Sequence, residues 1–347
     1  MIKSRESNIE LLRIIAFLMV VFIHVSTVGL YIPHGITHST KLSWYYSTII
    51  RCITNPAISL YILISGYLLS KKNEINVCKN LKRLFIPLLI YLPFFVYAYI
   101  DLYSKTNINP ASQIFVDFIT LSGMFHHLWY IFAYTFIIFI SPIVLNAITS
   151  VDRKKIKIIL ILCALFIGVS NIIGCLFNIG ILKGMFDNNV LYLMIMYMIG
   201  LYIGTYNVKY PKKVLIILIL LCFSINYYIF YCQNNNMSGY LNLSMIANNF
   251  CITNIIASIC IFLFFKDISF NNKIINKIAI NTYGAFIIHT FYILYLQRIL
   301  PFTNYVRYNN YFIYDILFVL LVSTCSILTE KARNVLVDLF STHKIRK

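Results

Sequence analysis

Ten long apolar runs follow one another along the chain, and they constrain its fold more than any other feature. A helix needs about 20 mostly apolar residues to cross a hydrocarbon core of about 30 Å. Lipid cannot satisfy backbone N–H and C=O groups, so such runs must be helical. The sequence therefore predicts an all-α polytopic membrane protein with about ten transmembrane helices. The predicted spans are Ile9–Leu30, Tyr45–Leu69, Leu84–Tyr103, Leu128–Ile148, Ile156–Leu176, Val190–Tyr206, Val214–Cys232, Met245–Phe265, Ile278–Leu296 and Tyr311–Leu328.

The composition agrees with this class and excludes several others. Hydrophobic residues make up 60% of the 347 positions and charged residues 12%, whereas soluble domains carry about 45–50% apolar and about 25% charged residues. This balance excludes a soluble enzyme, a disordered protein, a disulfide-rich secreted domain and a nucleic-acid-binding protein. The nine cysteines form no Cys-x-x-Cys pair and no His-Cys cluster with zinc spacing, so we expect no metal.

The basic residues predict the orientation of the chain. With the N-terminus inside and the loops assigned alternately, 23 of the 29 Lys and Arg residues fall on the inner side and six on the outer side. Every inner loop contributes to this excess, which predicts that both termini are cytoplasmic. The net charge of +18 then reflects orientation and contact with anionic membrane lipid. We expect a transmembrane domain over residues 1–330 and a cytoplasmic, interfacial tail over residues 331–347.

The first predicted span carries three ionisable residues, Glu10, Arg13 and His24. Charged groups inside a span are costly and mark a functional site by default. Arg13 and His24 lie on one helix face, about 16 Å apart along the axis. Glu10 lies about 40° around the helix, to the other side of the stripe that these two residues form. This face would carry a cation near the cytoplasm and an imidazole beyond mid-membrane. Alternatively, Arg13 extends to lipid phosphate, Glu10 simply pairs with Arg13 at i,i+3, and His24 is a structural histidine.

Three further histidines accompany later spans. His126 and His127 open the fourth span and precede Trp129 and Tyr130. A Trp-Tyr pair at this place is also typical of the aromatic belt at a membrane interface, with the two histidines exposed beside it. His289 lies at middle depth in the ninth span and is expected to be buried.

A basic helix face precedes the third span. Lys79, Lys82 and Arg83 recur at i, i+3 and i+4, so their side chains would project from one side of a helix. Such a face can hold the phosphates of a ligand. It is equally consistent with ordinary positive charge on a cytoplasmic loop.

Five sequence elements follow one another along the chain: Glu10–Arg13 followed after ten residues by His24, Ser65–Leu69, Lys82–Pro87, His127–Ile131, and Thr282–Gly284 with His289. Together they resemble the membrane-bound acyltransferase-3 family. The family usually has Asp where this chain has Glu10, a difference that keeps the charge. The order and spacing of the elements match across nearly the whole chain, and the similarity is greatest to stand-alone polysaccharide O-acetyltransferases.

The resemblance implies a reaction and a location. Such proteins take an acyl group, usually acetyl, from cytoplasmic acyl-CoA and pass it to a hydroxyl of a surface glycan or lipid-linked oligosaccharide. We therefore expect acetyl-CoA as co-substrate and the cytoplasmic membrane of a bacterial cell as the location. The outer loop over residues 104–126 is the expected gate for the acceptor.

The resemblance also implies roles for individual residues. His24 and Glu10 would be catalytic, with His24 acting either as general base on the acceptor hydroxyl or as a transient acyl-imidazole. The phosphates of the donor would be held by Arg13, Lys79, Lys82 and Arg83. The acceptor would be contacted by His127, Trp129, Tyr130, Tyr283 and His289.

Two other classes of protein share some of these features. A transporter or flippase of a small or lipid-linked substrate would also have many spans and buried ionisable groups. Transporters often show two related halves and interrupted helices, and neither is clear in this sequence. An inactive membrane sensor or scaffold of the same fold would not need both Arg13 and His24. The ordered elements favour the enzyme.

Overall fold

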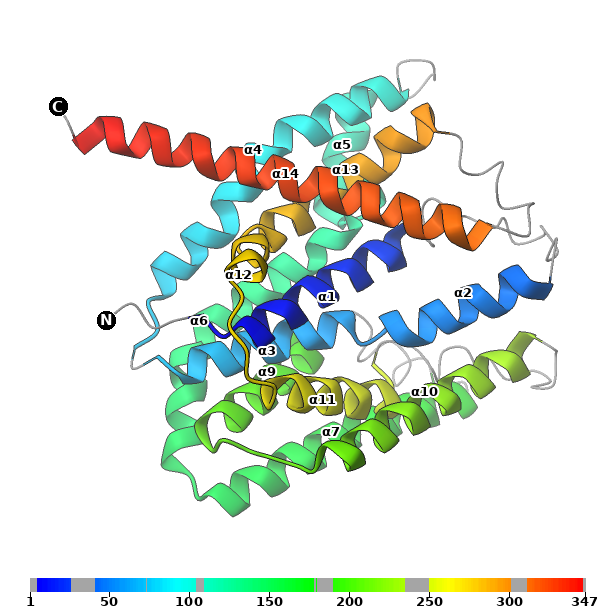
Figure 1. The fold of residues 1–347 in the computed structure, drawn as a ribbon, viewed down its shortest axis with the longest axis vertical. Helices are drawn as coiled ribbons and strands as arrows, with labels where there is room; N and C mark the ends of the chain where they lie inside the picture. Colours follow the sequence, from blue (N-terminus) through cyan, green and yellow to red (C-terminus); the bar gives the residue numbers. More distant parts are fainter. Residues whose placement is uncertain are drawn as a thin grey trace. The chain divides into compact units, whose positions relative to one another are not determined.

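A computed structural model describes residues 5–25, 41–72, 74–103, 109–177, 179, 190–234, 250–300 and 311–345. These residues form helices and no β-strand, which confirms the predicted all-α class (Figure 1). The described part of the first predicted span is α1 (Ser7–His24), which begins two residues before that span. Residues 26–30 of the first predicted span and 245–249 of the eighth lie outside the described residues.

The helices are those of a multi-pass membrane protein. Seven helical segments among the described residues are long and apolar enough to cross a membrane. The bent pair α12 (Lys273–Ala279) and α13 (Thr282–Ile299), with 57° between its helices, would provide an eighth. Two shorter apolar helices, α9 (Val190–Thr205) and α11 (Ile252–Lys266), occupy the places of two more predicted spans. Ten spans and cytoplasmic termini stay predictions.

Three helix boundaries differ from the predicted runs. The second run divides at Asn55 and Pro56 into α2 (Lys41–Thr54) and α3 (Ala57–Ser70), because proline offers no N–H to continue the helix. The third begins earlier, since α4 (Val77–Tyr103) includes the basic face. The last predicted run ends at Leu328, whereas α14 (Tyr311–Ile345) continues past residue 331 without a break, so the expected tail is helical as far as Ile345. Its cytoplasmic placement stays a prediction.

The segment expected to form the outer loop over residues 104–126 is largely helical where the structure describes it, and its outer placement and its role as an acceptor gate stay predictions. Residues from 110 onward form α5 (Pro110–Thr120) and the 3-10 helix η2 (Gly123–Leu128). The side chain of Asn109 accepts a hydrogen bond from the Ala111 N–H at 3.0 Å, and Pro110 occupies the first helical position. An Asn cap followed by proline is a strong helix start.

The chain divides into two compact units. Unit 1 comprises residues 1–16, 48–82 and 130–271, and unit 2 comprises residues 17–47, 83–129 and 272–347. The helices α1, α2 and α4 each contribute residues to both units.

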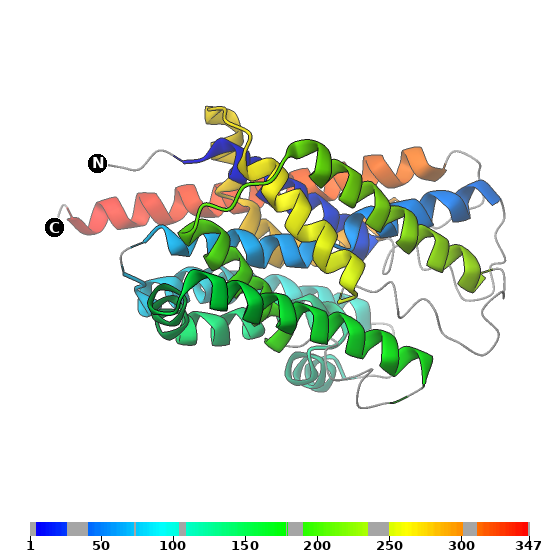
Figure 2. The same cartoon turned by 90° about the horizontal axis from the view of Figure 1, so that it is seen from below.

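Unit 1 is a helical bundle with α3 at its centre (Figures 1 and 2). The α3 helix packs on α9 and α11, and α11 also contacts α7 and α10. Nine of the fourteen residues of α3 are buried. The other long helices of this unit are α6 (Trp129–Ser150), α7 (Arg153–Leu176) and α10 (Lys212–Asn234).

Glycines allow α3 and α9 to pack backbone to backbone. A Cβ atom on Gly66 would lie 2.9 Å from the backbone nitrogen of Leu201 and would also meet the carbonyl oxygen of Tyr197. A Cβ atom on Gly200 would meet the carbonyl oxygen of Leu63. Gly200 and Gly204 form a Gly-x-x-x-Gly spacing, which places small residues on one helix face. The sequence analysis did not use this spacing, although it marks the contact.

Enlarging Gly200 should therefore destabilise unit 1. The side chain of Gly200→Leu would have to displace the backbone of α3, because the nearest atoms are main-chain atoms of Leu63. We expect the free energy of unfolding to fall by about 1–3 kcal/mol, which lowers the melting temperature in detergent by several degrees. Val214→Leu, which enlarges an exposed side chain on α10, should leave it unchanged. A wild-type melting temperature for Gly200→Leu would contradict the close packing.

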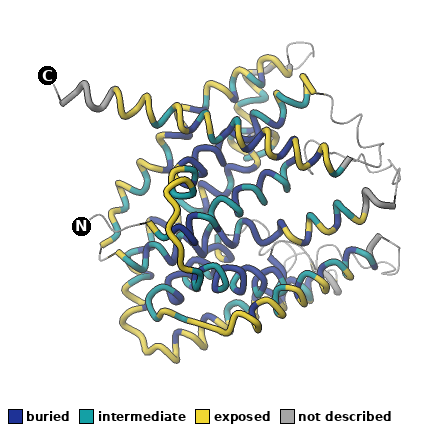
Figure 3. The backbone as a smooth tube through the Cα atoms, in the orientation of Figure 1, coloured by how far each residue is buried: buried dark blue, intermediate teal, exposed yellow. Residues whose placement is uncertain are grey.

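Unit 2 is organised around α13, which contacts α14 and η2. The first half of α13 is almost wholly buried, whereas α14 is exposed along residues 331–339 except at Arg333 and Asn334, which are half-buried (Figure 3). The same unit holds α12, α5, most of α4 and the part of α1 from Phe17 onward.

Candidate active site

Three histidines from separate helices meet in unit 2. His24 ends α1, His127 lies in η2, and His289 lies near the middle of α13. The ring centroids of His24 and His289 are 4.9 Å apart, those of His127 and His289 are 5.2 Å apart, and those of His24 and His127 are 6.1 Å apart. His289 is fully buried, His127 is 3% exposed and His24 is half-buried. We call these three residues the histidine cluster.

One turn of α13 supplies a hydrogen-bond partner to each of the three histidines. His289 Nδ1 lies 2.6 Å from the carbonyl oxygen of Phe286, and His289 Nε2 lies 2.7 Å from His24 Nδ1. His127 Nε2 lies 2.9 Å from the carbonyl oxygen of Ile287. The separation of 2.7 Å leaves no room for an ion between His24 and His289, and no group of potential metal ligands gathers in the described parts of the chain.

Aromatic rings surround the histidine cluster. Phe17 meets His289 edge-on with 6.5 Å between the ring centroids, and Phe286 lies 5.7 Å from both His289 and His127. Phe95 lies 6.1 Å from His127 and is fully buried. Hydrogen bonds among the histidines therefore lie in apolar surroundings, where an unmet polar group is costly and an existing hydrogen bond is strong.

Asp117 holds the turn that presents His127. Its carboxylate accepts hydrogen bonds from Tyr99 at 2.6 Å, Ser122 at 2.8 Å and Gln113 at 2.9 Å. The two residues on either side of Ser122 have positive φ, 51° at Leu121 and 55° at Gly123. The buried acid thus fixes a sharp connection between α5 and η2. Sequence reasoning did not single out Asp117.

Glu10 and Arg13 form the ion pair that their i,i+3 spacing predicts, within unit 1. Arg13 Nη1 lies 2.6 Å from one carboxylate oxygen of Glu10, and Arg5 Nη1 lies 3.3 Å from the other. Glu10 is 5% exposed, and the Arg13 side chain is 19% exposed. Glu10 therefore orients Arg13. Its predicted catalytic role stays a prediction.

The predicted donor-binding cations Lys79, Lys82 and Arg83 are all exposed on the first two turns of α4. The helix therefore exists where the basic spacing requires it. The three cations therefore share one face of α4, and their role in donor binding stays a prediction.

The other predicted acceptor residues have separate surroundings. Tyr130 belongs to unit 1, where its ring stacks on Tyr134 at 5.9 Å, while Trp129 closes the preceding segment of unit 2. Tyr283 donates a hydrogen bond to the Leu84 carbonyl oxygen at 2.9 Å and so joins α13 to α4. Of the five predicted acceptor residues, His127 and His289 join the histidine cluster, and roles in acceptor binding stay predictions for all five.

Two further buried acids were not singled out from the sequence. Asp315 is 2% exposed and accepts a hydrogen bond from Tyr46 at 2.9 Å. Glu330 is 3% exposed and accepts hydrogen bonds from Tyr91 at 2.6 Å and from Arg333. Asp315 lies within the predicted span Tyr311–Leu328, so an acid inside an apolar run, the signal that selected Glu10, would have found it.

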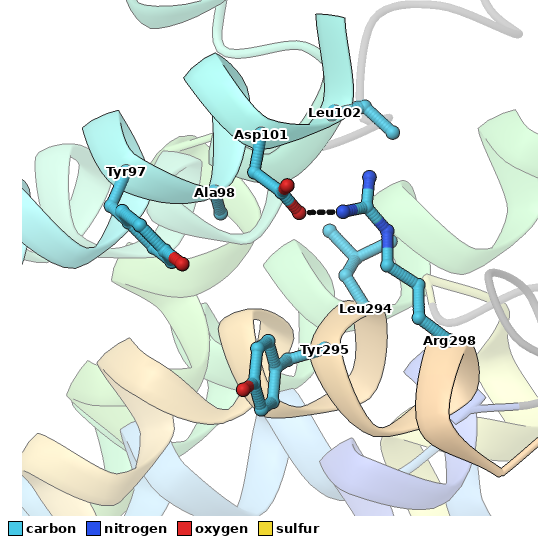
Figure 4. Close-up of a pocket in the computed structure, with 7 residues that line it drawn as sticks. All are labelled: Tyr97, Ala98, Asp101, Leu102, Leu294, Tyr295 and Arg298. Atoms are coloured by element: carbon cyan, nitrogen blue, oxygen red, sulfur yellow. Dashed lines mark ion pairs between the residues drawn. The ribbon is translucent and has the colours of Figure 1, made fainter. Parts of the chain in front are cut away.

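A shallow pocket is lined by residues of α4 and α13, and no residue of the histidine cluster lines it (Figure 4). An ion pair between Asp101 and Arg298 crosses it, with side chains 47% and 42% exposed. None of the predicted site residues lines this pocket. Its other lining residues are Tyr97, Ala98, Leu102, Leu294 and Tyr295.

The described residues form a multi-pass, all-helical membrane protein in which three histidines cluster within unit 2. A family model described as an acyltransferase domain matches residues 6–331 of the 347. The chain therefore belongs to the acyltransferase-3 family, and the resemblance drawn from its motifs is confirmed. No curated protein and no solved structure matches the chain.

Proposed function

We propose that the protein is an integral-membrane O-acyltransferase of the bacterial cytoplasmic membrane. It would move an acetyl group from acetyl-CoA to a hydroxyl of a surface glycan or lipid-linked oligosaccharide. The observation that carries the proposal is the contact of His24 with His289 in a buried cluster, within a chain of an acyltransferase family. An imidazole is suited to moving a proton or an acyl group at neutral pH.

His24 can serve the reaction in either of two ways. As a general base, it accepts the hydroxyl proton while the sugar oxygen attacks the acyl carbon and the thiolate leaves. As a nucleophile, it forms a bond from its nitrogen to the acyl carbon, the thiolate leaves, and the sugar oxygen takes the acyl group in a second step. Trapping of acetyl label on His24 in the absence of acceptor would distinguish the second route.

The donor phosphates would be held by cationic side chains. Guanidinium groups bind phosphate through two parallel hydrogen bonds, and Glu10 orients the guanidinium of Arg13. Lys79, Lys82 and Arg83 are exposed and so are accessible to a phosphorylated ligand.

The direct test is acyl transfer by the full chain in proteoliposomes. Acetyl-CoA labelled in the acetyl group is supplied with a lipid-linked oligosaccharide fraction, and alkali-labile label on the glycan is counted. Other acyl thioesters are run in parallel, because the donor is part of the proposal. Uptake of labelled oligosaccharide without acetylation would instead indicate a transporter or flippase and would overturn the proposal.

Arg13→Ala should weaken donor binding. Loss of a charge-assisted hydrogen bond costs about 1.5–3 kcal/mol, so we expect the Kd for acetyl-CoA to rise about 10- to 100-fold. Arg13→Lys keeps the charge but loses the planar guanidinium, so its Kd for acetyl-CoA should lie between those of the wild type and Arg13→Ala. Isothermal titration in detergent measures both. Arg153→Ala, at an exposed arginine of α7, is the matched control. An unchanged Kd in Arg13→Ala would leave Arg13 with a structural role.

A further inference from the structure

The hydrogen bonds of His289 fix where its proton lies. A carbonyl oxygen only accepts, so the contact of 2.6 Å with Phe286 requires a proton on His289 Nδ1. In the neutral ring, Nε2 then carries the lone pair. Because His289 Nε2 lies 2.7 Å from His24 Nδ1, it accepts a hydrogen bond from that nitrogen.

The same reasoning passes to His24. With its proton on Nδ1, a neutral His24 carries the lone pair on Nε2. The carbonyl of Phe286, the ring of His289 and the ring of His24 thus form a chain in which each proton has one assigned position. This hydrogen-bond chain begins at the carbonyl oxygen of Phe286, a main-chain atom of α13 that side-chain motion does not displace.

We propose that His289 is a positioning residue that holds His24 in the tautomer with a basic Nε2, rather than a contact for the acceptor. The inference rests on the proposed function for its catalytic meaning. The hydrogen-bond acceptor on His289 selects the reactive nitrogen of His24, and the rigid turn of α13 orients the ring. Second partners of this kind commonly fix both the tautomer and the direction of a working histidine.

The arrangement also balances the protons in both reaction routes. In the general-base route, His24 Nε2 takes the hydroxyl proton, and the Nδ1–H of the resulting imidazolium still donates to His289 Nε2. The proton on Nε2 is then transferred to the thiolate of the donor, which leaves as the thiol. In the acyl-imidazole route, the bond from Nε2 to the acyl carbon forms as the carbon–sulfur bond breaks. The Nδ1 proton then passes to His289 Nε2, which leaves a neutral acyl-imidazole. It returns to His24 Nδ1 when the sugar oxygen takes the acyl group and the bond from Nε2 to the acyl carbon breaks, and the hydroxyl proton is transferred to the thiolate of the donor.

A structural role for His289 is the competing explanation. The ring fills space beside Phe17 and Phe286 and is fully buried, so a substitution can act through packing alone. His289→Phe keeps an aromatic ring but removes the acceptor, and His289→Gln returns an acceptor oxygen on a flexible chain. These two variants separate packing from hydrogen bonding.

The kinetic test compares these variants in proteoliposomes. We expect His289→Phe to lower kcat about 100-fold with little change in KM, and His289→Gln to recover about 10-fold of that loss. His126→Phe is the matched control, because His126 is an exposed histidine of η2. A kcat of His289→Phe equal to that of the wild type overturns the inference. Equal losses in His289→Phe and His289→Gln also overturn it, since packing alone would then explain them.

The tautomer itself is measured without any acyl transfer. Protein labelled with ¹⁵N-histidine is placed in nanodiscs, and the His24 signals are assigned by their loss in His24→Ala. We expect Nδ1 to be protonated and Nε2 unprotonated in the wild type. A proton on Nε2 in the wild type overturns the inference, even if His289→Phe fails to fold. This readout also separates the two proposals, because a protein without transferase activity can still show the expected tautomer.

Discussion

His24→Ala is expected to abolish acyl transfer and to leave a folded protein in the membrane. The substitution removes the imidazole that accepts either the hydroxyl proton or the acyl group, and general base catalysis alone contributes about 100- to 10,000-fold. We therefore expect acetyl label on the glycan to fall by at least about 1,000-fold, near background. The measurement is the proteoliposome assay with matched amounts of protein, each checked by size-exclusion chromatography.

The controls of this experiment separate chemistry from folding. His24 is half-buried at the end of α1, so its truncation opens little core, but it leaves Nε2 of the buried His289 without its hydrogen-bond partner. The melting temperature should therefore fall by the equivalent of about 1–3 kcal/mol while the protein stays folded. His126→Ala removes an exposed histidine and should keep full activity. Acetylation that persists in His24→Ala would remove His24 from the mechanism. It would also remove the principal support for an enzyme at the histidine cluster.

The sequence predicted the parts of the fold that depend on local pattern. Long apolar runs must be helical in lipid, and the all-α class and the membrane class followed from that requirement alone. The i,i+3 spacing of Glu10 and Arg13 offered an ion pair as one of two explanations, and the structure contains that pair. Pro56 lies inside the second predicted run, where α2 and α3 divide. The Asn109-Pro110 helix start was readable in the same way but was not used.

The contacts within the candidate site could not be read from local pattern. His24 and His289 are 265 positions apart in the chain, and their hydrogen bond depends on how α1, η2 and α13 pack in unit 2. Helical periodicity gives the face of a residue but not the partner of that face. His289 was therefore assigned to the acceptor, although the structure shows it bonded to His24 and to a main-chain carbonyl.

Glu330 joins three helices of unit 2 through a buried carboxylate. Tyr91 of α4 donates to Oε2 at 2.6 Å, and Arg333 donates to both oxygens at 2.7 and 2.6 Å. On α13, the carboxylate lies against Gly284, where a Cβ atom would overlap it. Asn334 Nδ2 adds a hydrogen bond to Asn281 at 2.9 Å and so ties the end of this network to the start of α13.

Glu330→Ala should therefore be among the most destabilising single substitutions in unit 2. It removes the carboxylate that accepts hydrogen bonds from the Arg333 guanidinium and the Tyr91 hydroxyl, in a site where Glu330 itself is 3% exposed, and leaves Arg333 only the amide oxygen of Asn334. Removing one partner of a buried ion pair costs about 3–5 kcal/mol, because the remaining charge has lost its compensation. Glu330→Gln keeps the shape and should cost less. Thermal unfolding in detergent, followed by circular dichroism, measures both.

The matched comparison is the exposed ion pair in the pocket of Figure 4. Asp101 and Arg298 also join α4 to α13, but their side chains are 47% and 42% exposed. Exposed pairs contribute about 0–1 kcal/mol, because water solvates either charge when its partner is removed. Asp101→Ala should therefore shift the melting temperature far less than Glu330→Ala. Similar shifts for the two variants would show that burial does not set the strength of these contacts, and the anchoring role of Glu330 would then have to be abandoned.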